Sequence, residues 1–313
     1  MIQEETQSLL VLKDVALEVV KEQRRARRWG IFFKLLFVGM GLLLLIGINA
    51  DESGNKFTDA EEITAVVDIN GVIMDGALAS GEFVNPALKE AFEHEKTKGV
   101  LLRINSPGGS PVQSGIINDE IKRLKAKHKE IPVYAVVSDL CASGGYYIAV
   151  AADKIYADKA SIVGSIGVRM DNFGAVGLME KLGVERRLYT AGANKGMLDP
   201  FLPENETQVA HIKNMLNNTH QQFISVVKEG RGERLQNNPD IFSGLFWTGE
   251  DALKLGLIDG LGSDAYVARE LIKAEEMVNF TSEKDLFERL SERVETSAQA
   301  LLSMDATPRP VLR

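Results

Sequence analysis

Apolar runs rich in β-branched residues alternate with segments of helical periodicity, and this alternation limits the possible folds more than any other feature of the chain. It is typical of α/β folds with a largely parallel sheet. The runs at 65–67 and 133–137 are continuously apolar, as in strands that helices cover on both faces. We expect strands at 63–69, 99–104, 132–137 and 184–189, and helices at 85–97, 111–127, 143–152, 171–182, 205–229, 250–256 and 263–277.

An apolar stretch near the N-terminus divides the chain. Residues 31–48 carry one charge, Lys34, and have no polar face, which favours a membrane anchor over a buried core helix or a cleaved signal peptide. Basic residues precede the stretch and acidic residues follow it, so the N-terminus is expected in the cytoplasm. The predicted divisions are a cytoplasmic segment at 1–30, an anchor in the lipid bilayer at 31–49, a linker at 50–62, a folded domain at 63–282 and a mobile tail at 283–313.

The composition argues against several classes of protein. A formal net charge of −8 does not suit a nucleic-acid partner, which normally requires a basic surface. One cysteine, Cys141, excludes an intramolecular disulfide, and the 4 histidines show no paired metal-ligand spacing. We therefore expect no nucleic acid, no metal and no cofactor.

A glycine-containing turn follows the strand expected at 99–104. Residues 105–109 read Asn-Ser-Pro-Gly-Gly, and a helix is expected from Pro111. Because glycine allows positive φ and close approach of the backbone, such a turn exposes amide groups. An ordinary strand-to-helix turn has the same pattern, whereas a phosphate-binding loop does not fit it.

A serine opens the helix that follows the 133–137 strand. Ser143 precedes two glycines, Gly144 and Gly145, at the expected helix N-terminus. The free amides and the helix dipole there favour developing negative charge, and the glycines leave room for a substrate carbonyl. This is the setting of a nucleophile, but serine is also a preferred N-cap, and the residues alone leave both readings open.

A nucleophilic serine needs a base, and the histidines are poor candidates. His128 lies among lysines, and His211 and His220 lie on an expected surface helix, so a Ser-His-Asp triad is poorly supported. Cys141 has no partner and is expected at the buried end of a strand. Neither residue type offers a nucleophile and base pair.

Lysine is the remaining base, provided that burial lowers its pKa far enough to leave the amine neutral. Lys195 lies among small and apolar residues, with no other charge between 190 and 198. Burial without an ion-pair partner is one reading, and an exposed glycine-rich loop is the other. Ser165, in a third glycine-marked turn, adds a hydroxyl that is either structural or functional.

Together these segments resemble the signal peptide peptidase SppA family, whose members are membrane-anchored Ser/Lys peptidases of the Clp/crotonase-like fold. The resemblance spans about 62–275, and the Ser-Gly-Gly-Tyr-Tyr turn with a lysine 52 residues later is its most specific part. The chain resembles the short form with one catalytic repeat. The matching motifs are 68–73, 105–109, 142–149 with 152–153, 164–168, and Lys195 with 199–201.

The resemblance implies a role for each matching residue. Ser143 would be the nucleophile and Lys195 the general base, with Ser165 positioning the lysine. The backbone amides of Gly109 and Gly144 would form the oxyanion hole. The implied architecture is a superhelix of repeated ββα units with a helical C-terminal part.

The resemblance also implies an activity and a location. The expected protein is a serine endopeptidase that degrades remnant signal peptides and other hydrophobic peptides. It is expected as a homo-oligomeric ring with active sites at protomer interfaces. It would lie in the bacterial cytoplasmic (inner) membrane, with the catalytic domain on the periplasmic side. A noncatalytic membrane scaffold and an acyl-CoA hydratase or hydrolase of the crotonase type are the alternatives.

Overall fold

The computed structural model describes residues 21–25, 27–41 and 60–281. The chain divides into two units, Met1–Phe57 and Thr58–Arg313. In the first unit residues 27–41 are helical, and among the described residues no helix combines the length and the hydropathy needed to cross a bilayer. Part of the expected anchor, 42–49, and the expected tail, 283–313, lie outside the described residues.

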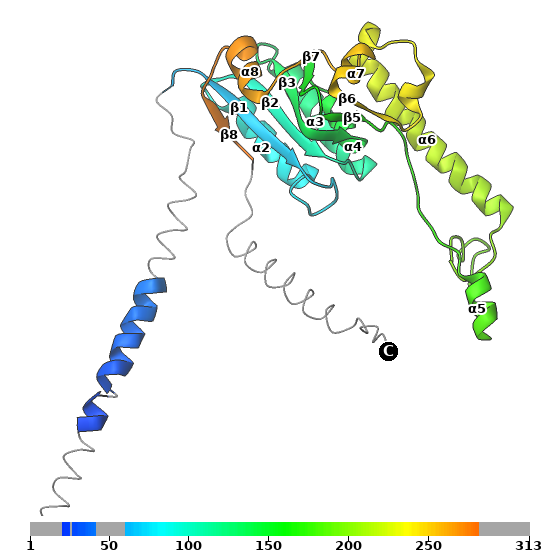
Figure 1. Cartoon of the computed structure of the whole chain (residues 1–313), viewed down its shortest axis with the longest axis horizontal. Helices are drawn as coiled ribbons and strands as arrows, with labels where there is room; N and C mark the ends of the chain where they lie inside the picture. The colour runs from blue at the N-terminus through cyan, green and yellow to red at the C-terminus, as the bar shows by residue number, and fades with distance from the viewer. Residues whose placement is uncertain (1–20, 26, 42–59, 282–313) are drawn as a thin grey trace, which may run out of the picture. The chain divides into compact units, whose positions relative to one another are not determined.

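The second unit is built on an 8-stranded sheet, whose strands are labelled in Figure 1. Its main path runs β6-β5-β3-β2-β1-β8, and β4 pairs with both β3 and β7. All pairs are parallel except β5 with β6. The predicted α/β class is confirmed. The strands are β1 Ile63–Asn70, β2 Thr97–Ser106, β3 Val133–Ala142, β4 Lys154–Ala157, β5 Ile162–Gly164, β6 Phe246–Thr248, β7 Gly260–Leu261 and β8 Met277–Asn279.

Helices connect the parallel strands, and polar caps mark where the longer ones begin. The Oγ of Ser110 accepts a hydrogen bond from the Gln113 amide at 3.3 Å at the start of α3, and Asn205 caps α6 in the same manner. The helices are α2 Gly81–Glu93, α3 Pro111–Lys127, α4 Gly144–Ala149, α5 Val176–Leu182, α6 Glu206–Arg231, α7 Gly249–Lys254 and α8 Asp264–Tyr266, with the 3₁₀ turns η1 Gly232–Arg234 and η2 Pro239–Phe242 and the π-helical turn η3 Val267–Ile272.

Apolar side chains cover both faces of the sheet, as the continuous apolar runs predicted. Successive residues of β1 point to opposite faces, so Ala65 and Val67 belong to one buried cluster and Val66 to another. The larger cluster packs against α2, α3 and α4, and the smaller one against η3. The sheet is therefore internal.

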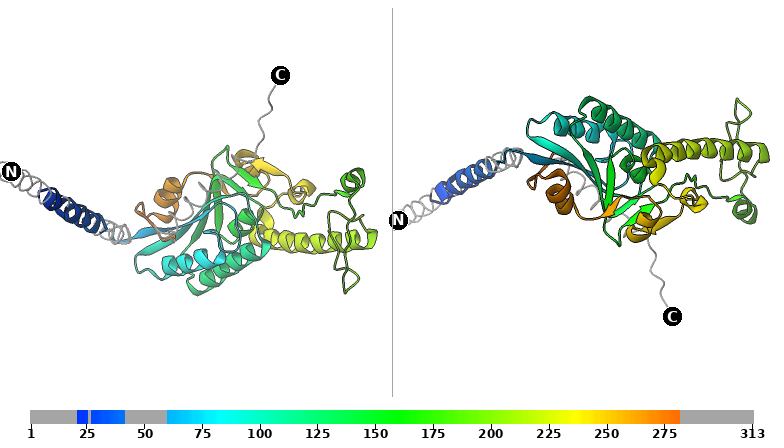
Figure 2. Two further views of the ribbon diagram at one scale, coloured as in Figure 1. Left: turned by 90° about the horizontal axis from the view of Figure 1, so that it is seen from below. Right: turned by 90° about the horizontal axis from the view of Figure 1, so that it is seen from above.

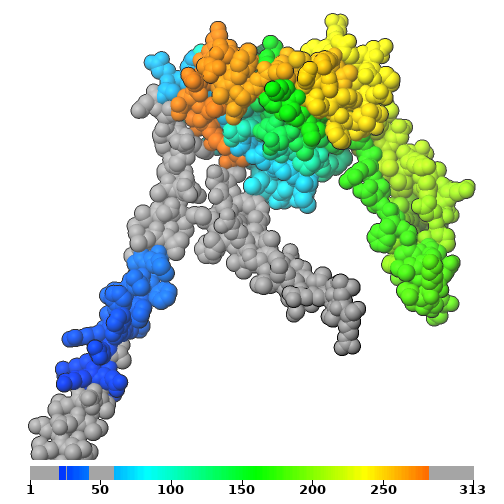
Figure 3. Space-filling model, viewed as in Figure 1, coloured from blue at the N-terminus to red at the C-terminus, as the bar shows by residue number. Residues whose placement is uncertain are grey.

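Helix α6 extends beyond the sheet, and α5 lies beside its outer end (Figures 1 and 2). The buried residues of α6 are Phe223, Val227 and Arg231, all in its C-terminal part, and α5 has none. We call α5, the segments on either side of it and the N-terminal part of α6 the arm. Figure 3 shows the arm, coloured green to yellow-green, projecting from the body of the unit. The arm thus leaves apolar side chains exposed, including Phe173 and Tyr189.

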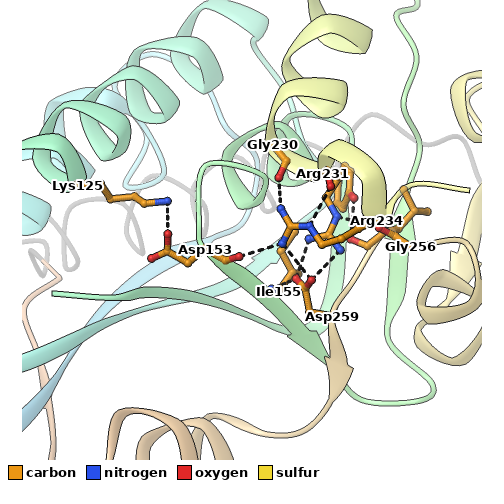
Figure 4. A network of polar contacts seen from close by, with 10 residues as sticks. Lys125, Asp153, Ile155, Gly230, Arg231, Arg234, Gly256 and Asp259 are labelled. Atoms are coloured by element: carbon orange, nitrogen blue, oxygen red, sulfur yellow. Dashed lines mark hydrogen bonds and ion pairs between the residues drawn. The ribbon is translucent and has the colours of Figure 1, made fainter. Parts of the chain in front are cut away.

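A buried ion pair fastens the base of the arm to the sheet (Figure 4). The guanidinium of Arg231, 1% exposed, donates to both oxygens of Asp259 at 2.7 and 3.1 Å and to the Gly256 carbonyl at 2.8 Å. Asp259 also accepts from the Ile155 amide on β4 at 2.7 Å and from Arg234 at 3.1 Å. The C-terminal end of α6 is therefore fixed to β4.

Several predicted elements differ from the structure. The strand expected at 184–189 is wrong, because these residues are exposed and have no regular structure or strand partner. The helix expected at 171–182 begins only at Val176, and the one expected at 263–277 is a short helix followed by a π-helical turn. Only α3 has the bounds that the sequence predicted.

Candidate active site

A cavity of about 770 Å³ opens beside the turns that follow β2 and β3, and the C-terminal half of α6 forms part of its wall. Of the residues that the sequence singled out, Gly109, Ser143, Gly144 and Ser165 all line it. Segments far apart in the chain thus meet at the carboxyl edge of the sheet. The full lining is Val72, Pro107, Gly108, Gly109, Pro111, Ser114, Ser143, Gly144, Tyr147, Ser165, Gly167, Val168, Arg169, Thr219, Gln222, Phe223, Ser243 and Gly244.

Ser143 occupies the N-cap position of α4 in a conformation that is unusual for serine. Its φ is 51°, and its side chain makes no capping hydrogen bond. The N-cap reading therefore does not account for this residue. Positive φ costs a non-glycine residue about 1–3 kcal/mol, and such strain persists only where the surroundings enforce it. Here the Ser143 amide donates to the Gly164 carbonyl at 2.8 Å, which holds the turn on β5.

The Pro-Gly-Gly turn is held by a parallel bridge to the segment after β1. The Ile73 amide donates to the Gly108 carbonyl at 3.0 Å, and the Ser110 amide donates to the Ile73 carbonyl at 2.7 Å. Gly109 itself takes no part in these two bonds, so its N–H points to the other side of the segment. Its φ of 152° and the Ile73 carbonyl beside it leave no room for a side chain.

The two glycine turns pack backbone against backbone next to Ser143. A Cβ added at Gly108 would lie 2.6 Å from the Gly144 nitrogen and 2.7 Å from the Ser143 Cβ. A Cβ added at Gly144 would lie 3.2 Å from the Gly109 nitrogen. The backbones of Gly109 and Gly144 therefore lie close together beside Ser143, with the Oγ of Ser114 next to them. Two neighbouring amides can stabilise an oxyanion where both N–H groups point to its position.

The chain is similar in sequence to known peptidases. Residues 125–278 match the family model Peptidase_S49, peptidase family S49. A putative protease of Methanocaldococcus jannaschii is 33% identical over 77% of this chain and 79% of its own length. A putative signal peptide peptidase SppA of Enterococcus faecium is 31% identical over 82% of this chain and 83% of its own.

The chain belongs to peptidase family S49. The resemblance to the SppA family is confirmed, and S49 is a family of serine-type peptidases. A Brucella melitensis protein named Na(+)/H(+) antiporter NhaA is 48% identical over 66% of this chain, but the chain spans only 29% of that protein's length. A solved structure of a mutant 1510-N membrane-bound stomatin-specific protease with a substrate peptide aligns over 75% of this chain and 98% of its own, at 20% identity and a TM-score of 0.44.

The third glycine-marked turn of this S49 chain, residues 164–167, forms another wall of the cavity. Ser165 has a φ of 54°, and its amide donates to the Leu245 carbonyl at 2.7 Å. Gly164, with a φ of 116°, lies so close to the Trp247 ring that an added Cβ would be 2.8 Å from it. The backbone of β5 and β6 thus presents the Ser165 hydroxyl to the cavity that contains Ser143.

Lys195 does not reach this cavity within one chain. It is exposed, and it lines a separate pocket in the arm with Asp199 and Phe201. The neighbouring Asn194 accepts a hydrogen bond from Gln208 in the first turn of α6. The cavity-lining residues of α6 begin at Thr219, roughly 16 Å further along the helix at about 1.5 Å per residue.

Helix α6 supplies cavity residues that the sequence did not single out. Thr219, Gln222 and Phe223 line the cavity, and the centroid of the Phe223 ring lies 5.1 Å from that of Tyr147 on α4. Their i, i+3, i+4 spacing is a signal of one helix face, but nothing in it indicates which neighbour that face meets.

Two histidines that were expected on the surface are partly buried. His220 lies 3.2 Å through Nε2 from the Ile166 carbonyl, and His128 packs its ring 5.6 Å from that of Phe92. Cys141, by contrast, is buried in β3 as expected, and burial raises the pKa of its thiol. None of the three lines the cavity around Ser143.

Proposed function

We propose that the chain is a membrane-anchored serine endopeptidase with a Ser143 and Lys195 catalytic dyad. The observation that carries the proposal is that a serine with positive φ at a helix N-terminus shares one cavity with the close-packed amides of Gly109 and Gly144. Membership of peptidase family S49 supports the same reaction class. We further propose that the sheet and its helices form the Clp/crotonase-like superhelix.

The chemistry follows from the positions of these groups. The neutral amine of Lys195 takes the proton of Ser143 while Oγ forms a bond to the carbonyl carbon of a peptide. The N–H groups of Gly109 and Gly144 stabilise the resulting oxyanion. The lysine ammonium then protonates the leaving nitrogen as the C–N bond breaks, and water, activated by the same amine, releases the acyl group. Ser165 positions the lysine by a hydrogen bond from its hydroxyl.

The lysine comes from a neighbouring copy of the chain in this proposal. Lys195 is exposed on the arm and lies well away from the cavity of its own chain. A homo-oligomeric ring in which each arm reaches the next protomer would place the amine at the partner's Ser143 cavity and bury it there. Each active site would then lie at a protomer interface.

The proposed substrates are remnant signal peptides and other hydrophobic peptides. Val72, Val168, Tyr147 and Phe223 make the cavity lining partly apolar, and among the described residues its one charged side chain is that of Arg169. We propose a cytoplasmic segment at 1–30, an anchor at 31–49, a linker at 50–62, a periplasmic peptidase domain at 63–282 and a tail at 283–313. The anchor would lie in the bacterial inner membrane.

Hydrolysis of a fluorogenic hydrophobic peptide by the full chain in detergent tests the dyad. Ser143→Ala and Lys195→Ala should each abolish turnover, whereas Lys181→Ala, which changes another lysine on the arm, should not. Equal turnover by the wild type and the Ser143→Ala variant would exclude the proposed nucleophile.

Mixing the two inactive variants tests whether the site is shared. Random co-assembly of Ser143→Ala with Lys195→Ala chains leaves about one quarter of the interfaces with both native residues. Refolding or co-expressing the two together should therefore restore about a quarter of the wild-type activity. No recovery from a mixed assembly would show that both residues act from one chain.

A further inference from the structure

We infer that His220 is a positioning residue that holds the 164–167 turn in its active conformation. This inference rests on the proposed function, because it concerns how Ser165 and Ser143 are kept in place for catalysis. His220 lies on α6, and its Nε2 is 3.2 Å from the Ile166 carbonyl, 54 residues away in the chain. A carbonyl oxygen only accepts, so the ring is the donor and carries hydrogen on Nε2.

The turn that His220 contacts is one that cannot hold its shape unaided. Gly164 and Ser165 both have positive φ, at 116° and 54°. For serine this conformation is strained and persists only where neighbouring groups enforce it. The Leu245 carbonyl fixes the amide of Ser165 from one side, and His220 fixes the next carbonyl, that of Ile166, from α6.

The same turn is bonded directly to the proposed nucleophile. The Gly164 carbonyl accepts from the Ser143 amide at 2.8 Å, and Ser143 also has positive φ. A shift of the turn would therefore move the hydroxyls of both Ser143 and Ser165. His220 does not line the cavity, although its neighbour Thr219 does, so its effect on the reaction must pass through the turn.

The position of His220 also couples the turn to the arm. The C-terminal end of α6 is fastened to β4 by Arg231 and Asp259, and its N-terminal turn is bonded to Asn194, next to Lys195. One helix thus connects the segment that carries the proposed base to the turn that carries Ser165. The hydrogen bond of His220 links α6 to that turn.

Two substitutions at His220, with side chains of similar length, separate the effect of the hydrogen bond from the effect of side-chain packing. His220→Gln keeps an N–H donor at the end of the side chain, and His220→Met removes it. We expect Met to lower kcat about tenfold with little change in KM, the loss typical of one hydrogen bond, and Gln to keep kcat near the wild-type value. The same two changes at His211, exposed on the same helix, should have no effect.

Amide hydrogen exchange tests whether the hydrogen bond from His220 holds the 164–167 turn, and it does so independently of activity. Exchange across 164–168 should speed up in the Met variant and stay near the wild-type rate in the Gln variant. Any of three results would overturn the inference: a wild-type kcat in the Met variant, equal losses of kcat in the Met and Gln variants, or an unchanged exchange rate across 164–168 in the Met variant. If Met does not fold, His220→Phe, which keeps a ring but no donor, takes its place. If exchange is faster in the Met variant than in the Gln variant but no Ser143-dependent hydrolysis occurs, the proposed function is wrong and the role of His220 in holding the turn is still supported.

Discussion

The backbone nitrogen of Gly109 and the α-carbon of Gly144 face one another so closely that a methyl group on Gly144 would lie 3.2 Å from that nitrogen and 2.4 Å from the Oγ of Ser114. Neither glycine therefore serves only as a flexible link. The absence of a side chain at each lets two turns, one after β2 and one after β3, pack backbone against backbone.

Gly144→Ala is expected to lower kcat by about 10²–10³-fold, the loss typical when one oxyanion donor is displaced. The added methyl group must displace the Ser114 hydroxyl, 2.4 Å away, and it presses on the Gly109 nitrogen at 3.2 Å. Steady-state kinetics with a hydrophobic peptide measure the effect. Gly115→Ala on α3 is the control, since nothing lies within 4 Å of the added group, and it should leave activity intact.

Ser143→Gly is expected to be more stable than Ser143→Ala by about 1 kcal/mol, although both lack the nucleophile. With φ at 51°, alanine keeps the strain of the wild type and glycine removes it. Chemical unfolding of the two variants measures the difference. At Ser225, inside α6, the order should reverse, because glycine destabilises a helix interior relative to alanine. Equal stabilities at Ser143 would show that the turn relaxes in the absence of the hydroxyl.

Arg231→Met is expected to destabilise the fold by about 3–5 kcal/mol, because it leaves Asp259 buried without its main cation. Arg123→Met removes an exposed ion pair with Glu120 and should cost about 0–1 kcal/mol. Denaturant unfolding of both variants at neutral pH compares the two sites. Similar small losses would indicate that water enters the Arg231 site.

The stability of the wild type should fall at acid pH more steeply than that of Asp259→Asn. Burial raises the pKa of the Asp259 carboxyl, but the hydrogen bonds and charge of Arg231, the Ile155 amide and the charge of Arg234 outweigh burial and hold that pKa below 3.8. A carboxyl with a lowered folded-state pKa contributes stability above its ordinary pKa and loses it as the pH falls through the folded value. Unfolding curves from neutral pH down to about pH 2.5 should converge for the two chains.

Cys141 is expected to resist alkylation in the folded enzyme. It is fully buried in β3, and burial raises the pKa of its thiol, so little thiolate forms at neutral pH. Iodoacetamide should label the chain only after denaturation, and peptidase activity should survive the treatment. Rapid labelling with loss of activity would place the thiol at the surface of the site.

Much of the framework could be predicted because burial on both faces leaves a local mark. Apolar runs rich in β-branched residues predicted β1, β2 and β3, and the turn at 105–109 with Pro111 after it predicted where α3 begins. The strands β4 to β8 have two to four residues each, too few for a periodic pattern to be visible. The run at 184–189 has strand-like residues but no partner strand, and pairing with a neighbour is what makes a strand.

By itself the sequence determined the α/β class, the peptidase family and the residues worth examining, because turn chemistry and motif spacing are local properties. The tertiary structure decided how they combine. It brought Gly109, Ser143, Gly144 and Ser165 to one cavity, placed Lys195 on an arm away from it, and moved His220 from an expected surface to the back of the Ser165 turn. Those relationships depend on sheet order and on where the C-terminal part of α6 packs, which no short stretch of residues encodes.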